Sequence, residues 1–389
     1  MSPPPTRTFL IAWHPGQRRW AGGLRYTALL QEAVRGLSFG QVEERKDPPT
    51  GGAFRKAAFW VFYLSATLLH LATVVFAGLG LLPVWRPLAR GLKSLLAWLW
   101  LPRVVEAPST TVLFEIGKSV YGPAWKKVLW VPDLQHRQLP ENFSAAQWIN
   151  REINWRGSYC LADAAVASSK AVERDIDHYW GRRALLHCWK FPASAPFRSD
   201  RPAPAIPAPY VLYAAQFWPH KGHADLCQAF RALIAARPGS ATLVLAGRAE
   251  SALPGLRDWI RAEKLEDRIL LTIDASDDVL GGYLQHATGL VFPSHFEGWS
   301  TSVLEAIALG VPLVLSDLPS HVEVGLPAEA HFKTGDATSL RSALEKLLWD
   351  PAFRKRIVDS YSSLSLPTAA SFARDVAATL ASLEDRSPG

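Results

Sequence analysis

Two glutamates, eight residues apart, lie in the segment of this sequence with the clearest chemical pattern. Glu297 falls in a loop after an expected buried strand, and Glu305 falls in the first turn of a helix expected at 302–309. Ser300 and Thr301 precede that helix, where backbone N–H groups have no partner within the helix. Such amides suit a phosphate, and ionised carboxylates accept strong hydrogen bonds from hydroxyl groups. The local chemistry indicates a ligand that joins a sugar, a diphosphate and a nucleoside.

Both glutamates also have a structural interpretation. Ser302 and Glu305 have the spacing of a capping box, in which each side chain bonds a backbone N–H at the start of a helix. Glu297 could equally be a solvated loop charge. Spacing alone leaves these alternatives open.

The pattern of apolar segments around these residues predicts two parallel α/β domains. Short apolar runs alternate with amphipathic helical stretches before and after a proline-rich segment. That alternation favours doubly wound sheets, which bind ligands at the carboxyl ends of their strands. We expect domains at 1–195 and 210–366, a linker at 196–209 and a cleft between the domains. The charged run at 43–47 is expected to be a surface stretch.

Composition narrows the class of partner. The chain has 389 residues, of which 49% are apolar and 20% charged, so a disordered protein is excluded. The net charge of +7 favours anionic partners: phosphorylated small molecules, anionic lipids or nucleic acid. Lysine and arginine are dispersed without a basic stripe, which argues against nucleic acid.

The cysteines and the amino terminus indicate the compartment. Three cysteines cannot build a disulfide framework, and a reducing compartment is the default. The first residues lack the long apolar run of a secretory signal, so we expect a cytoplasmic protein.

The segment at 54–102 differs from the rest of the chain. Residues 57–85 contain no Asp, Glu, Lys or Arg, basic residues lie on both sides, and a second apolar run covers 94–101. About 20 apolar residues can cross a bilayer, and basic flanks favour both ends on the cytoplasmic face. The segment predicts membrane insertion or, as the alternative, a helical hairpin buried in protein.

Topology restricts how this segment can meet a membrane. The strands expected at 8–13 and 110–131 must join one sheet, so 54–102 crosses a bilayer an even number of times or not at all. A re-entrant hairpin, an in-plane wedge that turns near 78–83 and a protein-buried hairpin all satisfy this condition.

The run FEGWSTSVLEAIALGVPLVLSD at 296–317 resembles the E-x7-E signature of family 4 glycosyltransferases, the mannosyltransferase-like group 1. The resemblance places Glu297 at the donor sugar and Glu305 at the ribose, with Gly298 and the helix start at Ser300 and Thr301 in the same donor site.

AAQFWPHKGH at 214–223 resembles the segment in which that family places a basic residue on the donor diphosphate. The resemblance assigns this role to Lys221, whose alternative is a solvated surface position. Many members carry an arginine five residues earlier, where this chain has Gln216, so the clamp on the diphosphate holds one charge fewer.

Two segments of the first domain also resemble the family. WVPDLQHRQLPENFS at 130–144 would place His136 beside the donor sugar, although a histidine in a polar loop is ordinarily a surface residue. RWAGGLRYTALL at 19–30 would bring the amides of Gly22 and Gly23 to the diphosphate, with a tight turn as the alternative.

The resemblance covers about 8–50 and 110–385 and leaves 54–102 without a counterpart. It implies a GT-B fold, in which two Rossmann-like domains face a cleft, and a helix within 367–389 that crosses back to the first domain. His136, Glu297 and Lys221 are the expected catalytic residues.

The expected activity is metal-independent, retaining hexosyl transfer without a cofactor, in polysaccharide or cell-envelope biosynthesis. The donor would be GDP-hexose or UDP-hexose, and the acceptor a lipid-linked saccharide or polysaccharide at the cytoplasmic face of the inner (plasma) membrane. The alternative is a catalytically inactive GT-B membrane scaffold or sugar-nucleotide sensor.

Overall fold

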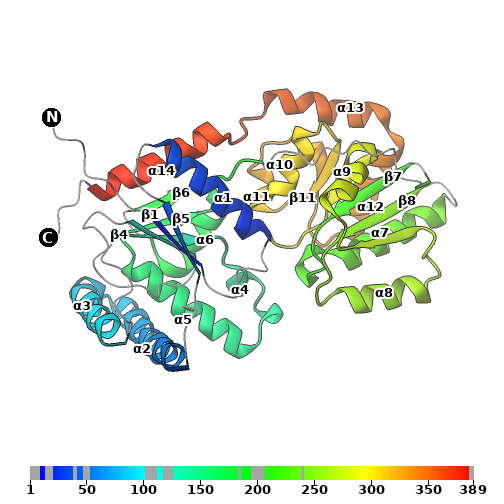
Figure 1. Cartoon of the computed structure of the whole chain (residues 1–389). Helices are drawn as coiled ribbons and strands as arrows, with labels where there is room; N and C mark the ends of the chain where they lie inside the picture. Colours follow the sequence, from blue (N-terminus) through cyan, green and yellow to red (C-terminus); the bar gives the residue numbers. More distant parts are fainter. Residues whose placement is uncertain are drawn as a thin grey trace. The chain divides into compact units, whose positions relative to one another are not determined.

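A computed structural model describes residues 9–13, 21–37, 42–46, 53–100, 112–116, 126–182, 185–193, 206–207, 209–237 and 241–384. The chain divides into two compact units (Figure 1). Unit 1 comprises residues 1–191 and 368–389, and unit 2 comprises residues 192–367.

Unit 1 is built on a six-stranded parallel sheet in the order β2-β1-β3-β4-β5-β6. Strands such as VLWV and AAVA are continuous apolar runs, as expected for parallel strands that are buried on both faces. Residues 43–46 of the charged run belong to an edge strand, and Asp47 lies outside the described residues. The strands are β1 (Phe9–Trp13), β2 (Val42–Lys46), β3 (Val112–Ile116), β4 (Lys126–Val131), β5 (Ala164–Ala167) and β6 (Leu186–Cys188).

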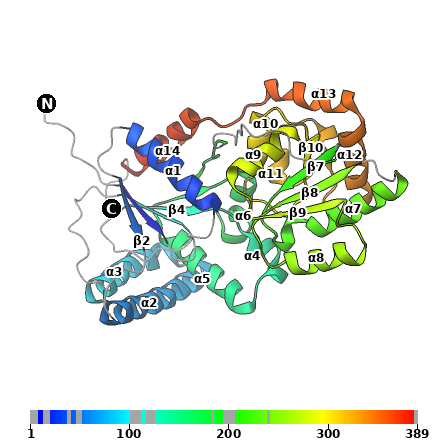
Figure 2. The ribbon, with the colours of Figure 1, turned by 45° about the vertical axis from the view of Figure 1, so that its right-hand side comes forward.

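The last helix of the chain packs in unit 1, beside the first helix (Figures 1 and 2). Trp189 Nε1 donates a hydrogen bond of 3.0 Å to Thr379 Oγ1, and the Phe372 ring packs against Trp189 and Phe191. The helices of this unit are α1 (Ala21–Gly36), α2 (Ala53–Gly78), α3 (Leu82–Trp100), α4 (Gln135–Gln138), η2 (Pro140–Asn142), α5 (Ala145–Leu161), α6 (Lys170–Trp180) and α14 (Ala369–Glu384).

Unit 2 is a second six-stranded parallel sheet, in the order β12-β11-β10-β7-β8-β9. The direction of winding reverses between β7 and β10, so the carboxyl ends of these two neighbours form a switch point where ligands bind in such sheets. The strands are β7 (Tyr210–Ala214), β8 (Thr242–Gly247), β9 (Ile269–Ile273), β10 (Gly289–Phe292), β11 (Leu313–Ser316) and β12 (His331–Phe332).

Helices alternate with these strands, as the sequence pattern predicts. They are η3 (Pro219–Lys221), α7 (His223–Ala236), α8 (Leu253–Ala262), α9 (Asp277–His286), α10 (Thr301–Ala308), α11 (Pro319–Val322), η4 (Ala328–Ala330), α12 (Ala337–Trp349), α13 (Pro351–Ser360) and η5 (Tyr361–Ser363).

The apolar segment forms a hairpin of α2 and α3 that packs on α5 (Figures 1 and 2). His70 on α2 is fully buried, and its Nδ1 lies 3.2 Å from Asn154 Oδ1 on α5. Gly157 lies against the same histidine, where an added Cβ would come within 2.5 Å of the His70 Cβ. The absence of a side chain at Gly157 is what lets the two helices approach this closely.

Arginines on α3 bind the carboxyl end of α5, where carbonyl groups lack helical partners. Arg86 Nη2 donates to Ala162 O at 2.7 Å, and Arg90 Nη2 donates to Leu161 O at 2.8 Å and to Asp163 Oδ1 at 2.7 Å. These bonds also place positive charge at the negative end of the helix dipole. The hairpin is therefore an integral part of unit 1, held by one face. In the part of the chain that the structure describes, no helix combines the length and the apolar character needed to cross a membrane.

We expect Gly157→Ala to lower the free energy of unfolding by about 1–3 kcal/mol, because the new methyl group would overlap with the Cβ and the backbone of His70. Gly91→Ala, on α3 of the same hairpin, is the matched control. No atom lies within 4 Å of a Cβ at Gly91, so the helix should gain up to about 1 kcal/mol. Urea-induced unfolding measures both; equal stability of the two variants would contradict the close packing of α2 on α5.

Candidate functional site

The helix that carries the second glutamate begins one residue earlier than expected. Ser300 is the N-cap of α10, its side chain makes no capping bond, and Thr301 is the first helical residue. Glu305 is thus the fifth residue of α10, in its second turn, outside the position that a capping box requires. The capping interpretation of Ser302 and Glu305 is wrong. The Glu305 side chain is buried, with 5% of the residue exposed.

Glu297 is held in a network of short hydrogen bonds in the loop before α10. Lys221 Nζ lies 2.6 Å from Glu297 Oε1, and Ser294 Oγ donates to the same oxygen at 2.7 Å. The backbone carbonyl of Glu297 accepts a bond of 2.9 Å from Ser320 Oγ. Only 19% of the Lys221 side chain and 13% of the Glu297 side chain are exposed. Neither residue is a freely solvated surface charge.

The charge state of Glu297 follows from this pairing. Burial alone would raise the pKa of its carboxyl group, but the positive charge of Lys221 and the hydrogen bonds from Lys221 and Ser294 outweigh burial and lower the pKa. The carboxylate is therefore ionised at neutral pH and can accept hydrogen bonds from hydroxyl groups.

A glycine allows the loops after β7 and β10 to meet. Gly222 follows Lys221 with a φ of 70°, in the left-handed region, and an added Cβ would lie 2.1 Å from Pro293 O. His295 N also donates to His220 O at 2.8 Å, which ties the two loops by their backbones. Lys221 from the first loop thus reaches Glu297 from the second.

Tyr213, near the end of β7, contacts both loops through its hydroxyl group. Its hydroxyl group donates to Lys221 O at 2.9 Å and lies 3.1 Å from Ser294 Oγ. Burial raises the pKa of Tyr213, so it stays neutral and acts as a hydrogen-bond donor. The sequence analysis missed Tyr213 and Ser294. Tyr213 lies in a buried apolar strand, where its sequence context predicts a core residue. Ser294 lies three residues before Glu297, and its hydroxyl group was a signal for a hydrogen bond to that carboxylate.

His321 is a further buried group near this network. Its Nδ1 donates to Ser316 O at 3.0 Å, and burial lowers its pKa to about 4, so the ring is neutral at neutral pH. The charge of Glu297 acts on this ring in the opposite direction and raises the pKa. No sequence signal separated this histidine from the others.

The remaining unit 2 residues lie in the same two loops. Gln216 follows β7 and is half-buried, and its Oε1 accepts a bond of 3.1 Å from Trp218 Nε1. Gly298 follows Glu297 and leads to Ser300 at the start of α10. The structure therefore gathers the loop residues predicted for the donor site at the switch point of unit 2.

His136 belongs to unit 1 and is completely buried in α4. Its Nε2 lies 3.2 Å from Glu152 Oε2 on α5, and burial is the main cause that lowers its pKa. Four aromatic rings surround it with centroids 6.0–6.4 Å away: Phe143, Trp148, Trp155 and Trp180. Both sequence interpretations, a catalytic and a surface side chain, assume an accessible ring. The structure corrects this, because His136 joins α4 to the buried face of α5.

Glu152 is the charged centre of that cluster. Burial would raise the pKa of Glu152, but its hydrogen bonds with His136, Arg137 and Trp180 and the charge of Arg137 lower it to about 2. The predicted glycine loop also differs, because Gly22 and Gly23 are the second and third residues of α1. Their backbone N–H groups still lack partners within the helix.

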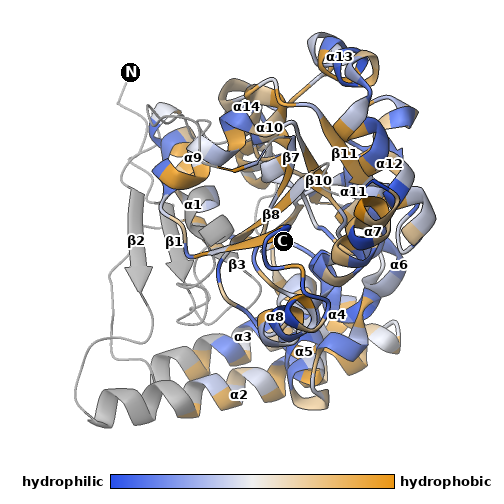
Figure 3. Cartoon of the chain, turned by 90° about the vertical axis from the view of Figure 1, so that its right-hand side faces the viewer, coloured by the Kyte–Doolittle hydropathy of each residue, from blue (hydrophilic) through white to orange (hydrophobic). Residues whose placement is uncertain are grey.

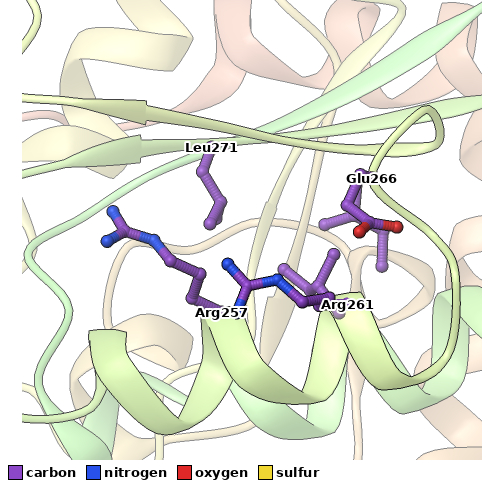
Figure 4. A pocket seen from close by; sticks show the side chains of 6 residues that line it. Arg257, Arg261, Glu266 and Leu271 are labelled. Carbon is purple, nitrogen blue, oxygen red and sulfur yellow. The ribbon is translucent and has the colours of Figure 1, made fainter.

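A pocket lies elsewhere on unit 2, between α8 and the edge strand β9 (Figure 4). None of the residues predicted for the donor site lines it. Its lining consists of Arg257, Ile260, Arg261, Glu266, Ile269 and Leu271.

We expect Lys221→Met to destabilise unit 2 by about 2–4 kcal/mol at pH 7, because the Glu297 carboxylate loses its counter-charge while it stays largely buried. The pKa of Glu297 should rise in this variant, so its deficit relative to wild type should shrink as the pH falls and the carboxyl group takes up a proton. The double variant Lys221→Met/Glu297→Gln should be less destabilised and lose this pH dependence.

Lys355→Met is the control, because Lys355 forms an exposed ion pair with Asp359 at 2.6 Å. It should change the free energy of unfolding by no more than about 0.5 kcal/mol. Urea unfolding of wild type and the three variants, at pH 7 and at pH 5, gives the free energies of unfolding to be compared. A Lys221→Met variant as stable as Lys355→Met would show that the buried pair contributes nothing.

Part of the sequence matches a known family model, and two further stretches of similarity involve known glycosyltransferases. Residues 197–361 match the family model described as glycosyl transferases group 1. The chain is 26% identical to glycogen synthase from Mycobacterium tuberculosis over 239 residues, which are 58% of this chain and 52% of that protein. It is 25% identical to the O-antigen chain mannosyltransferase RfbU from Salmonella typhimurium over 138 residues, which are 36% of this chain and 38% of that protein. The match thus spans about half the length of the glycogen synthase.

Structural comparison covers nearly the whole chain. Sucrose-phosphate synthase from Thermosynechococcus elongatus aligns with a TM-score of 0.66 and 16% identity over 98% of this chain and 100% of that one. HepE from Anabaena, solved in complex with UDP and glucose, aligns with a TM-score of 0.63 and 15% identity over 96% and 99% of the two chains. The predicted α/β fold of the GT-B type is confirmed. Lys221, Glu297 and Glu305 lie within residues 197–361, the part of the chain that matches the glycosyl transferases group 1 model.

Proposed function

We propose that this protein is a retaining glycosyltransferase that moves a hexose from UDP-hexose or GDP-hexose to a lipid-linked saccharide or polysaccharide. The observation that carries the proposal is the Lys221–Glu297 pair in the loops after β7 and β10, inside the segment that matches glycosyl transferases group 1.

Each part of the donor has a complementary group in this arrangement. The first-turn amides of α10 have no side-chain cap from Ser300 and suit a phosphate group. Lys221 supplies a point charge for the diphosphate, and the ionised Glu297 would accept hydrogen bonds from sugar hydroxyl groups. Glu305, in the second turn of the same helix, would bind the ribose diol.

The same groups account for departure of the nucleoside diphosphate. Negative charge develops on the diphosphate as the bond to the anomeric carbon breaks, and Lys221 with the helix amides would stabilise it without a metal ion. Gln216 would add a hydrogen bond rather than a second positive charge. His136 has no exposed surface, so we assign it a positioning role within unit 1.

The acceptor and the location are proposed on separate grounds. RfbU acts as an O-antigen chain mannosyltransferase and HepE holds UDP and glucose, which supports a nucleotide-sugar donor and a polysaccharide acceptor. The apolar hairpin at 54–102, with basic residues and no acidic ones, supports a lipid-linked acceptor at the cytoplasmic membrane face. Unit 1, which carries the hairpin, would bind the acceptor.

Calorimetric titration with UDP, GDP, ADP and CMP tests the donor site. We expect one nucleotide to bind selectively, and Glu305→Gln to weaken its binding by roughly 10- to 100-fold through loss of a charged hydrogen bond. Glu345→Gln changes an exposed glutamate of the same unit and should leave the affinity unchanged. If no nucleotide binds, or if both variants bind equally well, the proposed donor site is wrong.

Slow hydrolysis of the bound sugar nucleotide tests the reaction itself. The hexose released should at first keep the anomeric configuration of the donor, as proton NMR can show, and EDTA should not change the rate. Selective nucleotide binding without any cleavage or transfer would instead favour the inactive scaffold or sensor, for which Gln216 in place of an arginine is the motivating feature.

A further inference from the structure

The α2–α3 hairpin exposes a row of large apolar side chains, here called the apolar stripe. The described part of the chain has fourteen exposed large hydrophobic residues, and eleven of them lie on this hairpin. Their exposed fractions range from 38% at Val61 to 79% at Val84. The stripe consists of Val61, Leu64, Leu68, Leu71, Val75, Leu79, Leu81, Val84, Leu88, Leu92 and Leu95.

The spacing of these residues places them on one face of each helix. On α2 they recur every three or four residues from Val61 to Val75, and on α3 they recur in the same way from Val84 to Leu95. Leu79 and Leu81 extend the row through the turn between the helices. The result is an apolar face on the described part of each helix, from Val61 to Leu95. Figure 3 shows the hairpin beside α5.

The opposite face of the hairpin is already used. Leu69 and Ala89 are buried together with Leu161 of α5, and His70 contacts Asn154 on the same helix. A hairpin that entered the hydrocarbon core of a bilayer would have to give up these contacts and the bond between Arg90 and Asp163. Among the described side chains of the hairpin, the stripe is the apolar face that this attachment leaves exposed.

The charges around the stripe restrict that partner. No Asp or Glu occurs between Pro48 and Val105, whereas this stretch contains six basic residues, Arg55, Lys56, Arg86, Arg90, Lys93 and Arg103. Arg86 and Arg90 bind the end of α5 and Lys93 is buried, so these three side chains are not counted as headgroup contacts. A surface of anionic lipids complements the net positive charge of such a segment, which has no acidic residue to repel headgroups, while the apolar side chains enter the boundary of the acyl chains. Two copies of the stripe would instead bring like charges together.

We propose that the apolar stripe binds an anionic lipid bilayer in its plane. The α2–α3 hairpin lies flat at the boundary between headgroups and acyl chains, and α5 stays packed behind it. This inference rests on the proposed function, for which it selects the in-plane arrangement over the re-entrant and protein-buried ones. It places unit 1 at the bilayer surface, where a lipid-linked saccharide would be anchored.

Flotation of the full chain with vesicles tests the docking surface. Wild type should float with vesicles of equal phosphatidylcholine and phosphatidylglycerol, and bind vesicles of phosphatidylcholine alone at least tenfold more weakly. Leu68→Glu/Leu88→Glu, which changes one exposed residue on each helix, should reduce binding to the anionic vesicles at least tenfold. Val322→Glu, at a residue of unit 2 that is 52% exposed, should bind like wild type.

Three results would overturn the inference. Wild type could fail to float with either vesicle, or Val322→Glu could lose binding as the stripe variant does. In the third case, wild type would elute as a dimer without lipid and Leu68→Glu/Leu88→Glu as a monomer, which would show that a second copy covers the stripe. If Leu68→Glu/Leu88→Glu loses vesicle binding but keeps its nucleotide affinity, the substitutions have affected the docking surface alone. If wild type binds no nucleotide, the proposed function is wrong, whatever the vesicles show.

Depth measurement separates the in-plane arrangement from a re-entrant one. A fluorophore on Leu79→Cys, at the turn of the hairpin, should be quenched by lipids spin-labelled near the headgroup and only weakly by lipids labelled near the end of the acyl chain. Stronger quenching by the deep label would show that the hairpin enters the hydrocarbon core and that the in-plane arrangement is wrong.

Discussion

The ion pair between Lys221 and Glu297 is the interaction on which the candidate site depends. A carboxylate that is 13% exposed is costly unless a counter-charge and hydrogen bonds accompany it. Lys221 and Ser294 supply both, and they can do so only because Gly222 lets the loop after β7 pass within contact distance of the loop after β10. The loops at the switch point of the sheet are thus joined by the charged pair of Lys221 and Glu297.

The two units use buried charge in different ways. In unit 2 the Lys221–Glu297 pair joins two loops at the switch point, with 19% of the lysine and 13% of the glutamate side chain exposed. In unit 1 Glu152 is enclosed by His136, Arg137 and Trp180, and its hydrogen bonds join three helices. A strongly lowered carboxyl pKa at Glu152 is therefore a sign of packing rather than of catalysis.

The alternation of apolar runs and helices was enough to predict both sheets, because parallel strands buried on two faces require continuous apolar sequence. That criterion missed β2, whose sequence VEERK has one apolar residue and which has a single neighbour at the edge of the sheet. The role of Glu305 as a cap depended on whether α10 begins at 301 or at 303, and local sequence does not determine a helix boundary that closely. His136 looked accessible because its immediate neighbours are polar, while the rings that bury it come from later helices.

Asp163, just before β5, connects the hairpin to the sheet of unit 1. One of its carboxylate oxygens accepts a bond from Arg90 on α3, and the other accepts a bond of 2.9 Å from the backbone N–H of Lys127 on β4. A single side chain thus couples the outermost helix of unit 1 to a central strand of its sheet. The hairpin is therefore connected to the sheet by a side chain as well as by its packing on α5, and loss of Asp163 would remove both hydrogen bonds of this connection at once.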